Sequence, residues 1–173
     1  MKKIVLALCL MLVLSLSLTA MATATTPAVP EGIPYEGAWL NVANYFYIYA
    51  PVDWLVLEVT EEKAAVGIIA SFSNADATQT LDIACAETTE DYTAEQLLTE
   101  LSADAANGDV DSLEINGNTF VSYERAADGV FGAVFLDPNF YVMHNFAFAP
   151  ITEEAQATAV AMLLTVNSIT PAE

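Results

Sequence analysis

Histidine and cysteine, the side chains that most often serve as bases, nucleophiles and zinc ligands, are scarce in this chain. Its 173 residues include one histidine, His144, and two cysteines, Cys9 and Cys85. That number is too small for a zinc site of the usual kind, and the Gly-x-Ser-x-Gly motif of hydrolases does not occur. The enzymatic alternative to a non-enzymatic role is hydrolysis by two carboxylates, as in glycosidases, because 23 residues are acidic. No particular pair of carboxylates stands out.

The histidine and the second cysteine both lie in stretches that alternate like β-strands. His144 is in phase with Phe146, and Cys85 is in phase with Ile83, so each points to an apolar side of its strand. This pattern favours a core or sheet-surface histidine over a catalytic base, and a buried, inert thiol over a nucleophile. Cys9 lies in the N-terminal segment described below as a signal peptide. Without that segment, Cys85 has no partner for an intrachain disulfide.

The segment Asp104–Glu114 is the best candidate for a metal site. When Glu114 is aligned with the last position of an EF-hand calcium loop, Gly108 takes the glycine position, and Asp109 and Asp111 take ligand positions. However, alanine occupies the first and third positions, and a hairpin rather than a helix follows. We therefore predict a solvated loop without a cofactor, with Asp109, Asp111 and Glu114 as candidates for weak Ca²⁺ binding.

Three tyrosines at alternate positions, Tyr45, Tyr47 and Tyr49, share one side of a predicted strand. Such a row can stack on sugar rings or dock a partner, but more often it packs beneath a helix while its hydroxyls reach water. Trp54 follows shortly after and is predicted to anchor the core. These four residues are the candidates for ligand binding.

The hydrophobic periodicity defines the elements that position these residues. Alternation predicts strands at Trp39–Val42, Tyr45–Ala50, Trp54–Val59, Val66–Phe72, Thr80–Ala86, Asp111–Ile115, Thr119–Glu124, Val130–Leu136 and Phe140–Phe148, with a polar break at residues 61–63. Thr93 and Gln96 form a capping-box signature that starts a helix, and Asn107-Gly108 is its predicted stop. A last helix is predicted to begin at Thr152.

The order of these elements is strands, a helix, a four-stranded antiparallel meander and a closing helix. This order predicts an α+β domain with a mostly antiparallel sheet sandwiched by helices. Apolar residues occupy both sides of the predicted strand Val130–Leu136, which indicates that both faces of the sheet are covered.

The N-terminus has the pattern of a secretory signal peptide over residues 1–24. Lys2 and Lys3 precede the apolar run Ile4–Leu14, and overlapping Ala-x-Ala sites end at Ala22 and Ala24. The apolar run is too short for a membrane span. A Pro-containing lead-in over residues 25–36 and a single domain over residues 37–173 are predicted to follow.

The charge of the mature chain excludes some classes of partner. Only Lys63 and Arg125 are basic after residue 24, against 23 acidic residues. Nucleic acid and anionic membrane surfaces both require Lys and Arg to displace counterions, so neither is an expected partner. We expect a secreted or extracytoplasmic monomer that does not insert into a membrane after signal removal. Its expected partner is a protein or another component of the cell envelope.

Several motifs occur in the order found in a known superfamily. Pro51-Val52-Asp53-Trp54 follows an aromatic strand, Asn116-Gly117 and then Phe120-Val121 follow the middle helix, and Asn167-Ser168-Ile169 ends the closing helix. In the order of these motifs the chain resembles the superfamily of PsbP-like and DcrB-like proteins, which includes Mog-type Ran-binding factors. The resemblance implies an α/β/α sandwich without an ancestral active site and an accessory or binding role, with no role residues to transfer. Together with the signal peptide, it leads us to expect an exported, non-enzymatic accessory or binding protein.

We predict that the exported protein begins at Thr25, or at Thr23 if the first Ala-x-Ala site is used, because signal peptidase cleaves after small residues at such sites. N-terminal sequencing of exported material measures this directly. An intact Met1 or a lipid-modified Cys9 would contradict the predicted export route.

Overall fold

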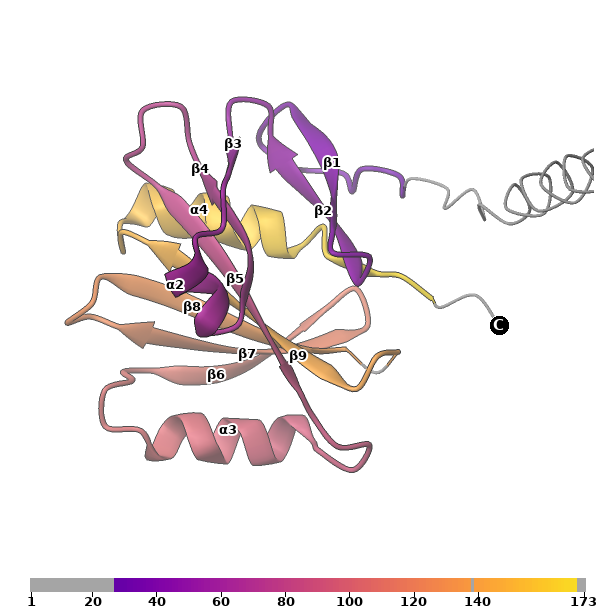
Figure 1. The fold of residues 1–173 in the computed structure, drawn as a ribbon, viewed down its shortest axis with the longest axis vertical. Coiled ribbons are helices and arrows are strands. Elements are labelled where there is room, and N and C mark those ends of the chain that lie inside the picture. The colour runs from indigo at the N-terminus through magenta and orange to yellow at the C-terminus, as the bar shows by residue number, and fades with distance from the viewer. Residues whose placement is uncertain (1–26, 138, 171–173) are drawn as a thin grey trace, which may run out of the picture.

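The computed structural model describes residues 27–137 and 139–170, and Figure 1 shows how their elements are arranged. The predicted signal peptide lies outside these residues. In chain order the elements are β1 (Gly37–Val42), β2 (Phe46–Pro51), β3 (Leu55–Leu57), α2 (Glu61–Ala65), β4 (Ile68–Ser73), β5 (Thr80–Glu87), α3 (Ala94–Ala103), β6 (Val110–Ile115), β7 (Asn118–Arg125), β8 (Val130–Asp137), β9 (Val142–Ala149), α4 (Glu153–Leu163) and β10 (Asn167–Ser168).

Most strands form one antiparallel sheet in the order β3-β4-β5-β9-β8-β7-β6. Strands β6 to β9 are the predicted meander, each paired with the strand before it. The meander joins the earlier strands through β5 and β9, which pair from Thr80 opposite Ala149 to Glu87 opposite Val142. A second, three-stranded sheet has the order β1-β2-β10.

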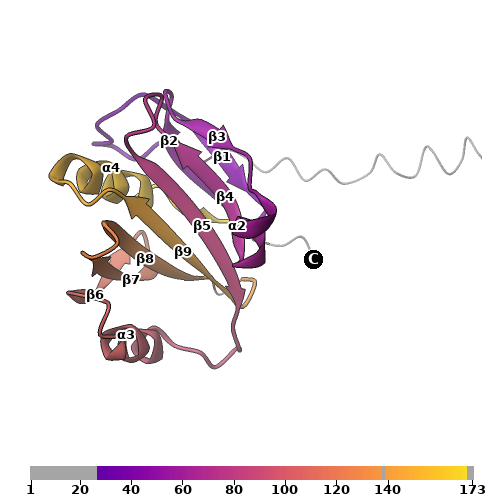
Figure 2. The same cartoon turned by 60° about the vertical axis from the view of Figure 1, so that its left-hand side comes forward.

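Both faces of the large sheet are covered, as the pattern of β8 predicted. On one face Phe131 and Phe135 of β8 pack into the main core with residues of α4 and β2. On the other face Val134 and Leu136 pack with α3 around Leu97. Figure 2 shows β7 and β8 between α3 and α4. The predicted α+β sandwich of an antiparallel sheet and helices is thus confirmed.

The local signals for helix starts and for the central hairpin are confirmed. The capping box at the start of α3 is present: Gln96 N donates to Thr93 Oγ1 (3.2 Å), and Thr93 N donates to Gln96 Oε1 (2.8 Å). Helix α4 starts in a related way, with Ala155 N donating to Thr152 Oγ1 (3.1 Å). Asn116 and Gly117 have φ values of 53° and 77°, the positive angles that a tight turn between β6 and β7 requires.

Several predicted boundaries were wrong. Residues 61–63, predicted as a polar break, belong to the helix α2, because Thr60 Oγ1 accepts a hydrogen bond from Lys63 N and caps the helix. The predicted strand Trp54–Val59 is reduced to β3. Helix α3 ends at Ala103, and Asn107 Nδ2 donates to Leu101 O (2.8 Å), so that this asparagine satisfies a carbonyl of the last turn.

The tyrosine side of β2 was predicted to pack beneath a helix, but at Tyr49 the lead-in covers it instead. Helix α4 packs on the opposite side of β2, where Phe46 and Ile48 enter the main core. Tyr49 is covered by the lead-in, where the Tyr35 ring stacks on it with centroids 5.9 Å apart. The Tyr35 hydroxyl donates to Tyr49 O (2.9 Å), and Gly37 N donates to the Tyr49 hydroxyl (2.9 Å). The end of the lead-in therefore packs as part of the domain.

We expect Gly132→Ala to lower the free energy of unfolding by about 1–3 kcal/mol, as overpacking does in a filled core. Gly132 lies opposite Tyr123, whose ring occupies the space that a Cβ would need. Tyr123 is buried, and its hydroxyl donates to Asn145 Oδ1 (3.0 Å), so the ring cannot move without loss. Chemical denaturation measures the change.

The matched test is Gly132→Ala in a Tyr123→Leu background, where the smaller side chain leaves room for the new methyl group. There the cost should be much lower than in the wild type. Equal costs in the two backgrounds would contradict the proposed overlap.

Candidate functional site

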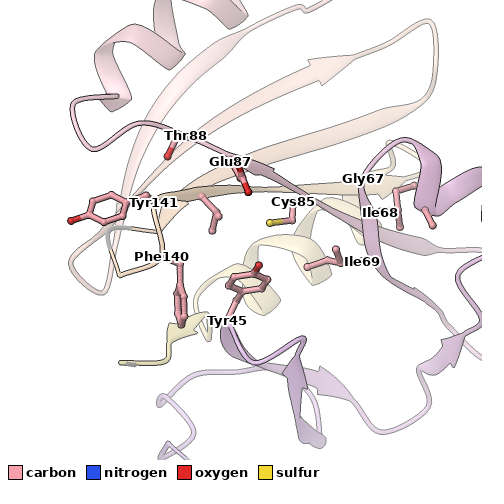
Figure 3. Close-up of a pocket in the computed structure, with 11 residues that line it drawn as sticks. Tyr45, Gly67, Ile68, Ile69, Cys85, Glu87, Thr88, Phe140 and Tyr141 are labelled. Atoms are coloured by element: carbon pink, nitrogen blue, oxygen red, sulfur yellow. The ribbon is translucent and has the colours of Figure 1, made fainter. Parts of the chain in front are cut away.

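A pocket of about 710 Å³ opens where α2, the start of β4, the end of β5 and the β8–β9 turn come together beside Tyr45, the residue before β2 (Figure 3). We call it the Tyr45 pocket. Its lining comes from four separate parts of the chain: Tyr45; Ala64, Gly67, Ile68 and Ile69; Cys85, Glu87 and Thr88; and Phe140, Tyr141 and Val142.

One wall depends on the turn between α2 and β4. Gly67 has φ +84°, a left-handed conformation that glycine adopts without strain. The turn is tied to β5 by Cys85 N, which donates to Gly67 O (2.9 Å). The register between β4 and β5 then shifts between Ile68 and Ala70. This irregularity brings Ile68 and Ile69 to the pocket at the start of β4.

The β8–β9 turn forms the opposite wall. Phe140 meets the Tyr45 ring edge-on, with centroids 5.1 Å apart. Thr88 N donates to Tyr141 O (2.8 Å), which fixes the turn against the end of β5. Figure 3 shows the Tyr141 side chain turned away from Tyr45, and it is 49% exposed. Tyr45 and Phe140 are therefore the two rings available to a ligand inside the pocket.

The Cys85 thiol lies beside Tyr45 on the same side of β5 as Ile83, as predicted (Figure 3). It is half-buried rather than fully buried. Burial raises the pKa of the thiol, and the charge interaction with Cys85 is the largest cause of the raised pKa of Tyr45. The thiol therefore stays protonated at neutral pH, which disfavours nucleophilic chemistry.

His144 lies opposite Cys85 in the β5–β9 ladder and is 0% exposed. Its ring is 5.0 Å from that of Tyr45 and 4.9 Å from that of Phe46, measured between centroids. Burial lowers the pKa of His144 to about 4, so the imidazole is neutral at pH 7. Within the described residues neither ring nitrogen has a hydrogen-bond partner, and Asp137 Oδ2 lies 3.9 Å from Nε2. His144 is thus a core residue behind the pocket.

The four predicted ligand-binding residues are not brought together. Tyr45 lines the pocket, whereas Tyr49 and Tyr47 lie opposite Trp39 and Asn41 in the small sheet. Trp54 is partly buried and packs against the main core. Of the predicted row, only Tyr45 takes part in this site.

The three predicted metal ligands also do not converge. Asp111 and Glu114 are three residues apart in β6, so their side chains leave opposite faces of the sheet. Glu114 Oε1 accepts a hydrogen bond from Thr119 (2.6 Å), and Asp109 is an exposed residue before the strand. Among residues 27–137 and 139–170, no group of three or more His, Cys, Asp and Glu side chains could hold a metal ion.

Sequence reasoning missed most of the pocket. Ile69 and Glu87 lie near the ends of strands, and neither residue type is unusual at such a position. Phe140 was predicted as the first residue of a strand, but β9 begins at Val142. One signal could have placed Phe140 in the turn: the aromatic pair Phe140-Tyr141 directly follows the turn sequence Asp137-Pro138-Asn139. An aromatic side chain in a turn needs another residue to pack against.

Comparisons with known proteins define the fold. No protein-family model matches the chain, and no curated protein matches its sequence. The solution structure of cyanobacterial PsbP (CyanoP) from Synechocystis sp. PCC 6803 superimposes with a TM-score of 0.55 at 9% identity, covering 82% of this chain and 98% of that one. The chain therefore has a PsbP-like fold, as its motif order predicted.

A crystal structure of a Bacteroides thetaiotaomicron VPI-5482 protein aligns with a TM-score of 0.46 and 15% identity, covering 75% of this chain and 47% of that one. The fold assignment rests on the cyanobacterial structure alone. In the part of the chain that the structure describes, no helix is long and apolar enough to cross a membrane.

The buried state of His144 predicts an acid-dependent loss of stability. Its pKa of about 4 lies below the ordinary value of 6.5, so the folded state binds fewer protons than the unfolded state between these values. The stability that His144 contributes is complete above pH 6.5 and is lost as the pH falls toward 4. Burial raises the pKa of Asp137, which acts in the opposite direction: its destabilising effect increases as the pH rises.

We expect the free energy of unfolding of His144→Phe to fall less between pH 6.5 and pH 4 than that of the wild type. The reason is that a phenylalanine side chain cannot bind a proton. Urea unfolding at several pH values measures this difference. NMR titration of the imidazole Cε1 proton provides a direct check. A midpoint near 6.5 in the folded protein would contradict the buried, unpartnered ring.

Proposed function

We propose that this chain is an exported, non-enzymatic accessory or binding protein of the cell envelope or extracellular space, and that the Tyr45 pocket is its ligand site. The observation that carries the proposal is the composition of the pocket. It has aromatic and aliphatic walls from Tyr45, Phe140 and Ile69, a protonated thiol and one carboxylate, Glu87. A few polar groups in an apolar cleft are typical of small-molecule binding sites.

The charges favour a ligand with an apolar body and a cationic group. Glu87 is the charged residue of the lining, and no basic side chain lies in it. The mature chain has 23 acidic residues against Lys63 and Arg125, so its field attracts cations and repels anions. The faces of Tyr45 and Phe140 offer a further attraction for an organic ammonium group. We infer a small amphiphilic amine as the ligand class.

The alternative of a carboxylate-dependent hydrolase receives less support from this pocket. Glycosidases place two carboxyl groups on either side of the bond that they cleave. The Tyr45 pocket offers Glu87 alone. The PsbP-like fold is compatible with a binding role, which is the role that the motif resemblance implies.

The test uses two amphiphiles that differ in the charge of the head group, n-octyltrimethylammonium and octanoate. We expect the mature protein to bind the ammonium compound and not the carboxylate in isothermal titration calorimetry. Ile69→Trp should abolish binding by filling the pocket. Glu87→Gln should weaken it about fivefold, because a partly exposed charge pair contributes little more than this.

Glu62→Gln is the matched control, since it removes one acidic charge from the exposed surface of α2 outside the pocket lining. It should leave the affinity unchanged. Equal binding of both amphiphiles, or equal effects of Glu62→Gln and Glu87→Gln, would reject the proposed ligand class. Binding that survives Ile69→Trp in a folded protein would reject the site.

A further inference from the structure

A second pocket, of about 420 Å³, lies near the C-terminal end of the domain and shares no lining residue with the Tyr45 pocket. Segments that are distant in the sequence build it: the lead-in at Pro27–Pro30, Trp39 of β1, the β6–β7 hairpin, the β8–β9 turn and the chain from Leu164 to Ser168. We call it the asparagine pocket, because Asn116, Asn118, Asn139 and Asn167 line it. Its volume lies within the roughly 300–1,000 Å³ of small-molecule sites.

The lining of the asparagine pocket is neutral. None of its described lining residues is charged, although the chain carries 23 acidic residues. A side-chain amide both donates and accepts hydrogen bonds, as a sugar hydroxyl does. Four amides around one cavity therefore match a neutral ligand rich in hydroxyl groups better than an ion.

Two of the amides are held in place by the domain itself. Asn116 Nδ2 donates to Leu164 O, and Asn139 Nδ2 donates to Ser168 Oγ (2.9 Å). The Ser168 hydroxyl in turn donates to the buried Asp137 carboxylate (2.9 Å). Among the described residues the carbonyl oxygens of these two amides have no hydrogen-bond donor. Their orientation is thus fixed before a ligand arrives, which lowers the entropic cost of binding.

The side-chain amides of Asn118 and Asn167 have no evident structural role. Turn geometry accounts for Asn116, whose φ is positive, but Asn118 and Asn167 lie in the strands β7 and β10. Asparagine is disfavoured in strands. Neither side chain has a hydrogen-bond partner among the described residues, so both amides can bind a ligand.

Trp39 adds an aromatic surface to these polar groups. It is half-buried, and its ring packs against that of Tyr49 with centroids 5.3 Å apart at a 59° angle. This contact holds the indole in place at the pocket. An indole beside several amides combines an apolar face for the C–H groups of a sugar ring with partners for its hydroxyls.

We propose that the asparagine pocket binds a neutral saccharide, with Trp39 against a sugar ring and the four asparagine amides on its hydroxyl groups. This site is separate from the Tyr45 pocket, and its ligand is of a different chemical class. In an exported protein it would attach the domain to a neutral glycan while the Tyr45 pocket remains free.

The experiment screens the mature protein against neutral oligosaccharides (cellohexaose, maltohexaose, mannohexaose and chitohexaose), an acidic one (a galacturonate hexamer) and a neutral peptide, triglycine amide. Binding is followed by ¹H–¹⁵N chemical shifts. We expect at least one neutral oligosaccharide to bind, with the largest shifts at the Trp39 indole and the asparagine side-chain amides. The acidic oligosaccharide should bind more weakly or not at all.

Three variants locate the site. Asn118→Asp and Asn167→Asp keep the side-chain shape and remove a donor, so each should weaken saccharide binding about fivefold or more. Trp39→Ala should abolish it. Asn44→Asp, an exposed asparagine of the β1–β2 turn outside the pocket, is the control with the same change of charge and should have no effect.

Failure of all four neutral oligosaccharides to bind would overturn the proposal. So would binding that is unchanged in Asn167→Asp, or shifts that map to the Tyr45 pocket. Binding of triglycine amide at the asparagine pocket in preference to the saccharides would also overturn it and assign the site to a peptide.

Discussion

The pairing of β5 with β9 is the contact on which the rest of the structure depends. It joins the strands that precede α3 to the meander that follows it, and places Ile83 opposite Phe146 and Cys85 opposite His144. Since alternate residues face opposite sides of a sheet, a slip of one residue would move all these side chains to the other face. The main core and the back of the Tyr45 pocket therefore result from one register.

The same register has a cost at His144. A fully buried imidazole without a hydrogen-bond partner in the described structure is unfavourable, and the aromatic rings of Tyr45, Phe46 and Phe135 that surround it keep it neutral. Tyr45 is at once a neighbour of this histidine and a wall of the pocket. Because the Tyr45 ring packs on the His144 ring, protonation of His144 at low pH would place a charge behind one wall of the pocket.

How much of this could be predicted depends on how local the signal is. The capping box at Thr93, the turn at Asn116-Gly117 and the two apolar sides of β8 are set by neighbouring residues, and the structure confirms each of them. Together they predicted the α+β class, and the motif order predicted the PsbP-like fold. The helix α2 was missed because it has five residues and no apolar stripe.

Neither pocket could be predicted, because each depends on contacts between distant segments. The Tyr45 pocket needs the β4–β5 irregularity at Ile68 and the turn at Phe140, neither of which alternation alone reveals. The four asparagines of the second pocket are dispersed between residues 116 and 167, and pairing of β10 with β2 brings the last of them to Trp39. The sequence shows which side-chain types are present, but it does not show which of them come together in a pocket.

The central claim is that a ligand occupies the pocket formed by Tyr45 and Cys85, and the thiol itself reports on it. In a protein that begins at Thr25, as predicted, Cys85 is the one cysteine, so its alkylation by iodoacetamide can be followed by mass spectrometry without mutation. We predict slow labelling at neutral pH, because burial raises the thiol pKa, and further slowing by n-octyltrimethylammonium but not by octanoate. A labelling rate that does not change at saturating n-octyltrimethylammonium would contradict the claim.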